Sequence, residues 1–68
     1  MSFAKVIEVI AEGDTAEEAV KNAVTEAFKT VNKIRSIDCK HIQAIVEDNK
    51  VINYRVNAKI TFIVESGL

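Results

Sequence analysis

Apolar and polar side chains alternate almost without interruption from residue 52 to residue 64. One set of alternate positions holds Ile52, Tyr54, Val56, Ala58, Ile60, Phe62 and Val64, and the other holds Asn53, Arg55, Asn57, Lys59 and Thr61. Successive side chains of a strand point to opposite faces of a sheet, so this period of two predicts a long strand with one dry and one wet face. We expect Tyr54 and Phe62 to lie in the core.

Two further segments have the composition of strands. Residues 3–10 are rich in β-branched types, with Lys5 and Glu8 interspersed, and this strand is expected to end near residues 11–13. Residues 37–47 also read as a strand, and the polar run from Glu47 to Lys50 has the turn chemistry of a hairpin. The two C-terminal strands should therefore pair as neighbours.

Between the first two strands the period changes to steps of three and four. Thr15 can cap the first amides of a helix, and Glu18 can reach back to complete a capping box. The apolar positions that follow are Ala16, Ala19, Val20, Ala23, Val24, Ala27, Phe28 and Val31. This pattern predicts an amphipathic helix of about 18 residues with an alanine-rich stripe. Phe28 is the bulky member of the stripe and is expected in the core.

The order of elements is β-α-β-β, which predicts an α+β fold in a single domain over residues 1–68. A right-handed crossover makes the first two strands parallel, so the third most naturally inserts between them, antiparallel to both. We therefore expect a three-stranded, antiparallel-type sheet of order 1-3-2 with the helix on one face. The last strand is longer than the helix, so part of its apolar face needs cover from another subunit.

The size of the chain also favours association. A chain of 68 residues buries only about 60% of the surface that its unfolded form exposes, and small domains commonly compensate with disulfides, metals or oligomerisation. Cys39 is the only cysteine and His41 the only histidine, which excludes an intrachain disulfide and a zinc finger. Oligomerisation is what remains.

The charge pattern excludes other classes. The chain has nine basic and ten acidic residues, and no run of basic residues suited to binding a phosphate backbone. We therefore expect no nucleic-acid partner. The sequence shows no signal-like N-terminal segment and no apolar run of the ~20 residues that a membrane helix needs. Together with the single thiol, this predicts a cytoplasmic protein with no membrane partner.

Several segments together resemble the dodecin family over essentially the whole chain. They are Lys5 to Ile10, Glu17 to Val20 with Ala23, Val24 and Ala27, Asn32 to Arg35, Tyr54 to Val56, and Ile60 to Phe62. The resemblance implies this same fold, assembly into a hollow homododecamer, and a non-catalytic role in binding or storing a small ligand. For many members of the family that ligand is a flavin.

Two positions that the resemblance assigns to the flavin site differ in this chain. Where flavin-binding dodecins stack the flavin on a tryptophan, this chain has Ser36, and where they present a glutamine amide it has Arg55, which only donates hydrogen bonds. Residues 11–13, Ala-Glu-Gly, also replace the small Gly-Thr/Ser stretch of the family. Ser36 and Arg55 are therefore the candidate ligand-binding residues, and riboflavin or FMN is disfavoured as the ligand.

The same residues have plainer interpretations. Arg55 either binds an anion or forms an ion pair with a carboxylate such as Asp38 or Glu47. Cys39 and His41 are two residues apart on one strand, hence on one face, where a symmetry axis would be needed to complete a metal site; otherwise they are a partly buried thiol and an interface histidine. Ser36 lacks the partners of a nucleophile, so it reads as a small residue that opens a strand.

Three functions remain in competition. The first is a dodecin-like homo-oligomer that binds or stores a small ligand, with the usual flavin contacts replaced by Ser36 and Arg55. The alternatives are a flavin-binding dodecin with a modified pocket, and a structural shell or metal-ion-binding module without an organic ligand. An enzyme would need an acid–base or nucleophile pair, and His41 has only Cys39 near it in sequence, so we predict no catalysis and no catalytic residue.

Overall fold

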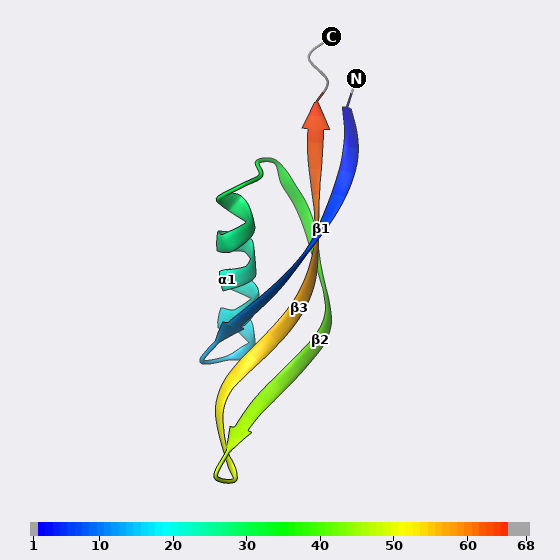
Figure 1. Cartoon of the computed structure of the whole chain (residues 1–68). Coiled ribbons are helices and arrows are strands. Elements are labelled where there is room, and N and C mark those ends of the chain that lie inside the picture. Colours follow the sequence, from blue (N-terminus) through cyan, green and yellow to red (C-terminus); the bar gives the residue numbers. More distant parts are fainter. Residues whose placement is uncertain (1, 66–68) are drawn as a thin grey trace.

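One helix packs across one face of a three-stranded sheet in a computed structural model that describes residues 2–65 (Figure 1). The elements in chain order are β1 (Ser2–Gly13), α1 (Ala16–Phe28), β2 (Ile34–Glu47) and β3 (Lys50–Glu65). The sheet has the order β1-β3-β2, and β3 pairs antiparallel with both neighbours. The predicted β-α-β-β fold and strand order are confirmed, although each strand is longer than the sequence pattern indicated.

The core lies where the alanine stripe of α1 meets β3. Ala19, Ala23 and Ala27 repeat every four residues and are buried, and they pack against the buried side chains of Val56, Ala58 and Ile60. The small methyl groups let the helix approach the sheet closely, so β3 supplies most of the volume. Burying a valine or isoleucine contributes roughly 1.5–3 kcal/mol each. Phe62 is also buried, as predicted, whereas Tyr54 is only half-buried.

The predicted cap begins the helix. Thr15 has extended backbone, and its Oγ1 accepts a hydrogen bond of 3.0 Å from the amide of Glu18. Glu18 reaches back as expected, but its Oε1 accepts from the amide of Asp14 at 3.4 Å instead of that of Thr15. Two donors at the helix start are thereby satisfied.

The helix ends earlier than predicted, at Phe28. The amides of Thr30 and Val31 both donate to the carbonyl of Ala27, and the Thr30 hydroxyl donates to the same oxygen. Thr and Val are weak helix formers, and this side-chain contact competes with further helical bonds. Lys33 then adopts a left-handed conformation, with φ of 57°, and turns the chain into β2.

Phe28 does not lie in the core of the chain, contrary to the prediction. The residue is 63% exposed. Only a narrow stripe of the helix, through Ala19, Ala23 and Ala27, faces the sheet, and Phe28 lies outside it. One residue further along a helix is rotated by about 100°, which carries Phe28 off the contact face.

The β2–β3 hairpin closes as expected on a two-residue turn. Asp48 and Asn49 both have positive φ, 52° and 61°, and the flanking Glu47 and Lys50 are paired. Two successive left-handed residues are the signature of the type I′ turn, whose twist matches that of the strands. Asp and Asn tolerate this conformation better than most residues.

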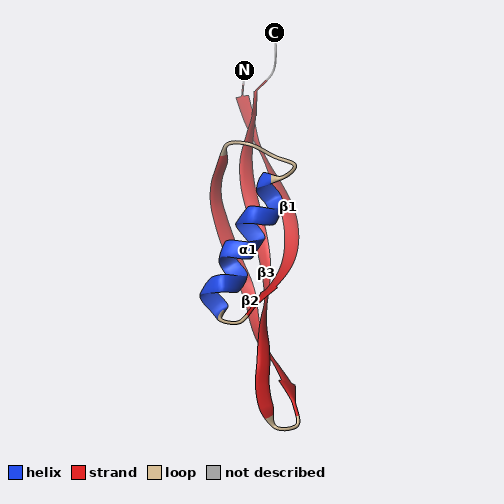
Figure 2. Cartoon of the chain, turned by 90° about the vertical axis from the view of Figure 1, so that its left-hand side faces the viewer, coloured by secondary structure: helices blue, strands red, loops and turns tan. Residues whose placement is uncertain are grey.

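The hairpin extends well beyond the N-terminal end of the helix (Figure 2). The molecule measures 56 × 19 × 13 Å and has a radius of gyration of 14.3 Å. A compact domain of this length has a radius of about 11 Å. Four large apolar residues that the helix does not cover, each more than half exposed, are Ile42, Val46, Val51 and Ile52.

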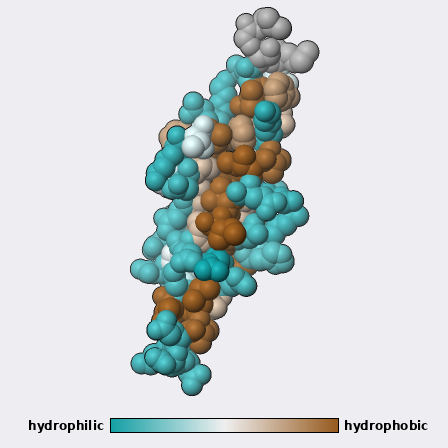
Figure 3. Space-filling view, viewed as in Figure 1, coloured by the Kyte–Doolittle hydropathy of each residue, from teal (hydrophilic) through white to brown (hydrophobic). Residues whose placement is uncertain are grey.

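A strip of hydrophobic residues is visible along the length of the molecule in the space-filling view (Figure 3). The single chain therefore leaves apolar surface open, and much of it belongs to the hairpin. No helix in the described part of the chain is long and apolar enough to cross a membrane.

Gly13 joins β1 to the helix at a point where no side chain fits. A Cβ atom there would lie 2.6 Å from the amide nitrogen of Ala19 and 2.9 Å from the carbonyl carbon of Glu18. Both atoms belong to the helix backbone, which cannot move aside without shifting the helix. We expect Gly13→Ala to lower the free energy of unfolding by about 1–3 kcal/mol, as overpacking does elsewhere.

The measurement is urea unfolding followed by circular dichroism, with Asp14→Ala at the adjacent exposed position as the control. Equal unfolding midpoints for Gly13→Ala and the unmodified protein would contradict the close approach of β1 to the helix.

Candidate ligand site on the outer face of the sheet

The face of the sheet opposite α1, called here the outer face, holds most of the candidate residues. Residues directly opposite each other in neighbouring antiparallel strands point to the same side. Because Val56, Ala58 and Ile60 face the helix, the residues that alternate with them face outward. The outer face comprises Val6, Glu8, Ile10 and Glu12 of β1, Arg55, Asn57, Lys59 and Thr61 of β3, and Ser36, Asp38, His41 and Gln43 of β2.

Arg55 is held by a carboxylate that sequence reasoning did not identify. Glu12 lies directly opposite Arg55, and its Oε2 accepts from Nε at 2.9 Å and from Nη2 at 2.7 Å. Its Oε1 accepts from Nδ2 of Asn53 at 2.9 Å. The expected ion pair of Arg55 is present, but its partner is Glu12 and not Asp38 or Glu47.

The pair is partly open to solvent. The side chains of Arg55 and Glu12 are 45% and 44% exposed. An ion pair with this exposure contributes at most about 1 kcal/mol to stability. Its two charge-assisted hydrogen bonds instead fix the orientation of the guanidinium on the outer face.

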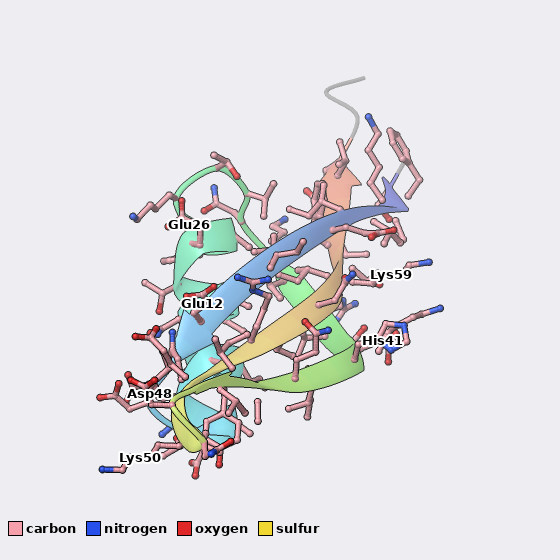
Figure 4. The ribbon with its side chains drawn as sticks, turned by 60° about the horizontal axis from the view of Figure 1, so that its bottom comes forward. Glu12, Glu26, His41, Asp48, Lys50 and Lys59 are labelled. Carbon is pink, nitrogen blue, oxygen red and sulfur yellow. The ribbon has the colours of Figure 1, made fainter. Side chains whose placement is uncertain are left out.

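A shallow hollow of about 220 Å³ lies beside this pair and spans all three strands. We call it the outer hollow, and it is lined by Ile10, His41, Gln43, Arg55 and Asn57. Gln43 lies directly opposite Arg55 on β2, and its amide both donates and accepts. Figure 4 shows Glu12 at the end of β1 and His41 on β2, pointing away from the helix. The hollow therefore offers mixed hydrogen-bonding groups beside one apolar side chain.

Sequence reasoning assigned only Arg55 of this group to a ligand site, and it considered His41 only as a possible metal ligand. The alternation did put Asn57 on the same face as Arg55, but it gave no information on which residues of β1 and β2 lie opposite. Ile10 and Glu12 join the group through the register of β1 with β3, and Gln43 joins through the register of β2, which its bulges set.

Ser36 lies far from Arg55 within one chain. It is exposed and pairs with Thr61, six residues along β3 from Arg55. At roughly 3.3 Å per residue the two positions are about 20 Å apart. The structure thus does not bring the two candidate residues into one pocket of a single chain.

Cys39 and His41 lie on opposite faces of the sheet, which corrects the sequence interpretation. Cys39 pairs with Ala58 and His41 pairs with Asn57, which are consecutive residues of β3. The register shift between them is a bulge that adds one residue to β2 and reverses the alternation. Cys39 is also exposed instead of partly buried. Within residues 2–65, no three His, Cys, Asp or Glu side chains gather to hold a metal ion.

A second hollow, of about 410 Å³, lies at the start of β2 and is lined by Lys33, Ile34, Arg35, Ile63 and Glu65. The Lys33 ammonium lies 2.7 Å from Oε1 of Glu65. This hydrogen bond and the charge of Lys33 lower the pKa of the Glu65 carboxyl. The small stabilisation from the pair is therefore present at neutral pH and is lost as the pH falls through that lowered pKa. Both side chains are exposed, so the pair is weak.

The structure is similar over nearly its whole length to several solved dodecins. The dodecin of Streptomyces coelicolor shares 30% identity with a TM-score of 0.89, and the match covers 97% of this chain and 96% of that chain. An arginine-to-alanine variant of the Thermus thermophilus dodecin shares 22% identity with a TM-score of 0.88, covering 97% and 100%. The dodecin of Streptomyces davaonensis matches at 14% identity and a TM-score of 0.88, covering 96% and 97%.

The sequence itself leads to the same family. None of the curated proteins compared with the chain matches it. The family model described as Dodecin, however, matches residues 3–65. That match covers more than half of the chain, and the fold agrees with it throughout. The chain therefore belongs to the dodecin family of non-catalytic, small-ligand-binding proteins, a family whose members form homo-oligomers.

Proposed function

We propose that the protein is a homododecameric storage or binding protein whose ligand site includes the outer hollow and is not the usual stacked-flavin site. The observation that carries the proposal is the Arg55 guanidinium, which is fixed by Glu12 on the outer face among Ile10, Gln43 and Asn57. An exposed, oriented donor beside amides and an apolar side chain suits recognition of a small molecule. The family match over residues 3–65 supports a single domain spanning the whole chain.

Assembly is supported by the surface that one chain leaves open. The accessible surface is 5025 Å², whereas a compact protein of this mass exposes about 4,200 Å². Ile42, Val46, Val51 and Ile52 of the hairpin are each more than half exposed. Covering each of them contributes on the order of 1 kcal/mol, a substantial sum for so small a core. A second copy of the chain provides a surface that can cover them.

The usual mode of flavin binding is disfavoured at both positions that the family resemblance assigns. Ser36 offers no aromatic plane, and Arg55 donates but does not accept. The position of Gln43 favours one alternative, a flavin-binding protein with a modified pocket. Gln43 lies directly opposite Arg55, so its amide can supply the donor and acceptor that Arg55 lacks. A purified assembly that carries bound flavin would favour this alternative.

Assembly is tested at Ile42, which is 56% exposed in the single chain. An aspartate there would cost a lone chain little, but it would be an unpaired charge where a second copy covers the hairpin. We expect Ile42→Asp to yield smaller species by light scattering, while Lys40→Asp, on the same strand, keeps the dodecamer mass. Full assembly of both variants would show that the hairpin is not at a subunit contact.

The ligand is tested by riboflavin fluorescence. We expect no quenching by the unmodified protein at submicromolar concentration. Ser36→Trp combined with Arg55→Gln should restore binding, since an aromatic pair contributes about 0.5–1.5 kcal/mol beyond its buried area. Ser36→Leu with Arg55→Gln is the control, because leucine adds apolar area without a stacking plane. Tight riboflavin binding by the unmodified protein would overturn the assignment of Ser36 and Arg55 and favour the alternative with Gln43.

A further inference from the structure

The charge of the outer hollow is decided by two residues that are 43 positions apart in the chain. Arg55 is the one side chain in its lining with a permanent charge, since Ile10, Gln43 and Asn57 carry none. The Glu12 carboxylate contacts that guanidinium at 2.7 and 2.9 Å. The charges of Glu12 and Arg55 cancel at the rim of the hollow.

The other charged side chains nearby on the outer face lie outside the outer hollow. The nearest ion pair on the outer face joins Lys59 to Glu8, with 3.9 Å between Nζ and Oε1. Asp38 pairs in register with the same lysine from β2. These three residues lie further along the sheet and do not line the outer hollow. The charge of Arg55 is therefore balanced by the Glu12 carboxylate beside it.

Glu12 is itself firmly positioned. One of its oxygens accepts from Arg55 and the other from Asn53, so both are in use on the same strand. The backbone carbonyl of Glu12 accepts from Nδ2 of Asn22 on the helix at 2.7 Å. The next residue, Gly13, is packed against the start of the helix. The carboxylate is therefore anchored through both its side chain and its backbone.

Arg55 retains hydrogen-bonding capacity after this pairing. A guanidinium has five N–H donors, and two of its nitrogens serve Glu12. The remaining donors, with the amides of Gln43 and Asn57, can satisfy a ligand that has both carbonyl and N–H groups. A ligand with its own negative charge would meet the Glu12 carboxylate beside the same guanidinium.

We infer that Glu12 is a specificity-determining residue, which neutralises Arg55 so that the outer hollow accepts an uncharged polar heterocycle and rejects anions. This inference rests on the proposed function of the hollow as a ligand site. Removing the Glu12 charge converts the hollow into an anion site, because the guanidinium then lacks its counter-charge.

The test uses inorganic phosphate as the probe, with thermal melts of the assembled protein across a phosphate titration. Ligand binding to the native state raises the melting temperature in a saturable way. We expect Glu12→Gln to bind phosphate about tenfold more tightly than the unmodified protein, a gain consistent with removing one like charge at close range. Glutamine keeps the size of glutamate and one accepting oxygen, which can still serve Arg55, while its NH2 group cannot accept from Asn53 as the second carboxylate oxygen does.

Glu8→Gln is the matched control, since it removes one charge from the same strand and face beside Lys59. The expected phosphate response of this variant equals that of the unmodified protein, and Glu12→Gln combined with Arg55→Gln should lose the gain. Equal responses of Glu8→Gln and Glu12→Gln would overturn the inference. So would phosphate binding by the unmodified protein as tight as that of Glu12→Gln.

Two further variants secure the interpretation. Glu12→Asp keeps the carboxylate and should still exclude phosphate. Glu12→Ser provides the same charge removal should Glu12→Gln fail to assemble, which sizing detects. The proposed function fails separately, when the purified assembly carries and binds no small molecule, and that outcome is independent of the phosphate response.

Discussion

The contact between a short alanine-lined helix and a much longer central strand governs the rest of the structure. The helix has 13 residues and is about 20 Å long, whereas the 16 residues of β3 extend for about 50 Å. Ala19, Ala23 and Ala27 let the helix sit close to the sheet, but they cover only its middle. The hairpin end and its apolar side chains therefore have no cover from their own chain. Membership of a homo-oligomeric family provides a natural solution, because other copies can bury that surface.

The uncovered outer face is also where the chemistry of the protein concentrates. No helix of residues 2–65 covers the outer face, so side chains of all three strands meet at the surface around Arg55. Glu12 holds the guanidinium in a salt bridge that adds little stability but fixes its direction. In the proposed function this arrangement serves recognition, since donors and acceptors stand at fixed positions. The dodecin family consists of non-catalytic binding proteins, as the sequence predicted for this chain.

The sequence patterns that depend on single segments were sufficient to predict the elements and their order. Alternation predicted β3 and its dry face, and the helix start at Thr15 followed from local capping chemistry. Contacts that depend on the register between strands could not be predicted from these patterns. Glu12 and Arg55 were seen as two separate departures from the family pattern, yet they form one contact. Cys39 and His41 were predicted to lie on one face because residues two apart share a face in a regular strand. The bulge between them places them on opposite faces. The exposure of the hairpin could be expected only in outline, since it depends on how far β2 and β3 extend past Gly13 and the start of the helix.

The dependence of folding on assembly is the central claim, and the concentration dependence of unfolding tests it most directly. Urea unfolding is followed by circular dichroism over about a hundredfold range of chain concentration, with the mass measured by light scattering at each concentration. For a chain that is stable only in its assembly, mass action raises the unfolding midpoint with concentration, and no folded monomer accompanies dissociation. A midpoint that stays constant over this range, together with a folded monomer at the lowest concentration, would contradict the account.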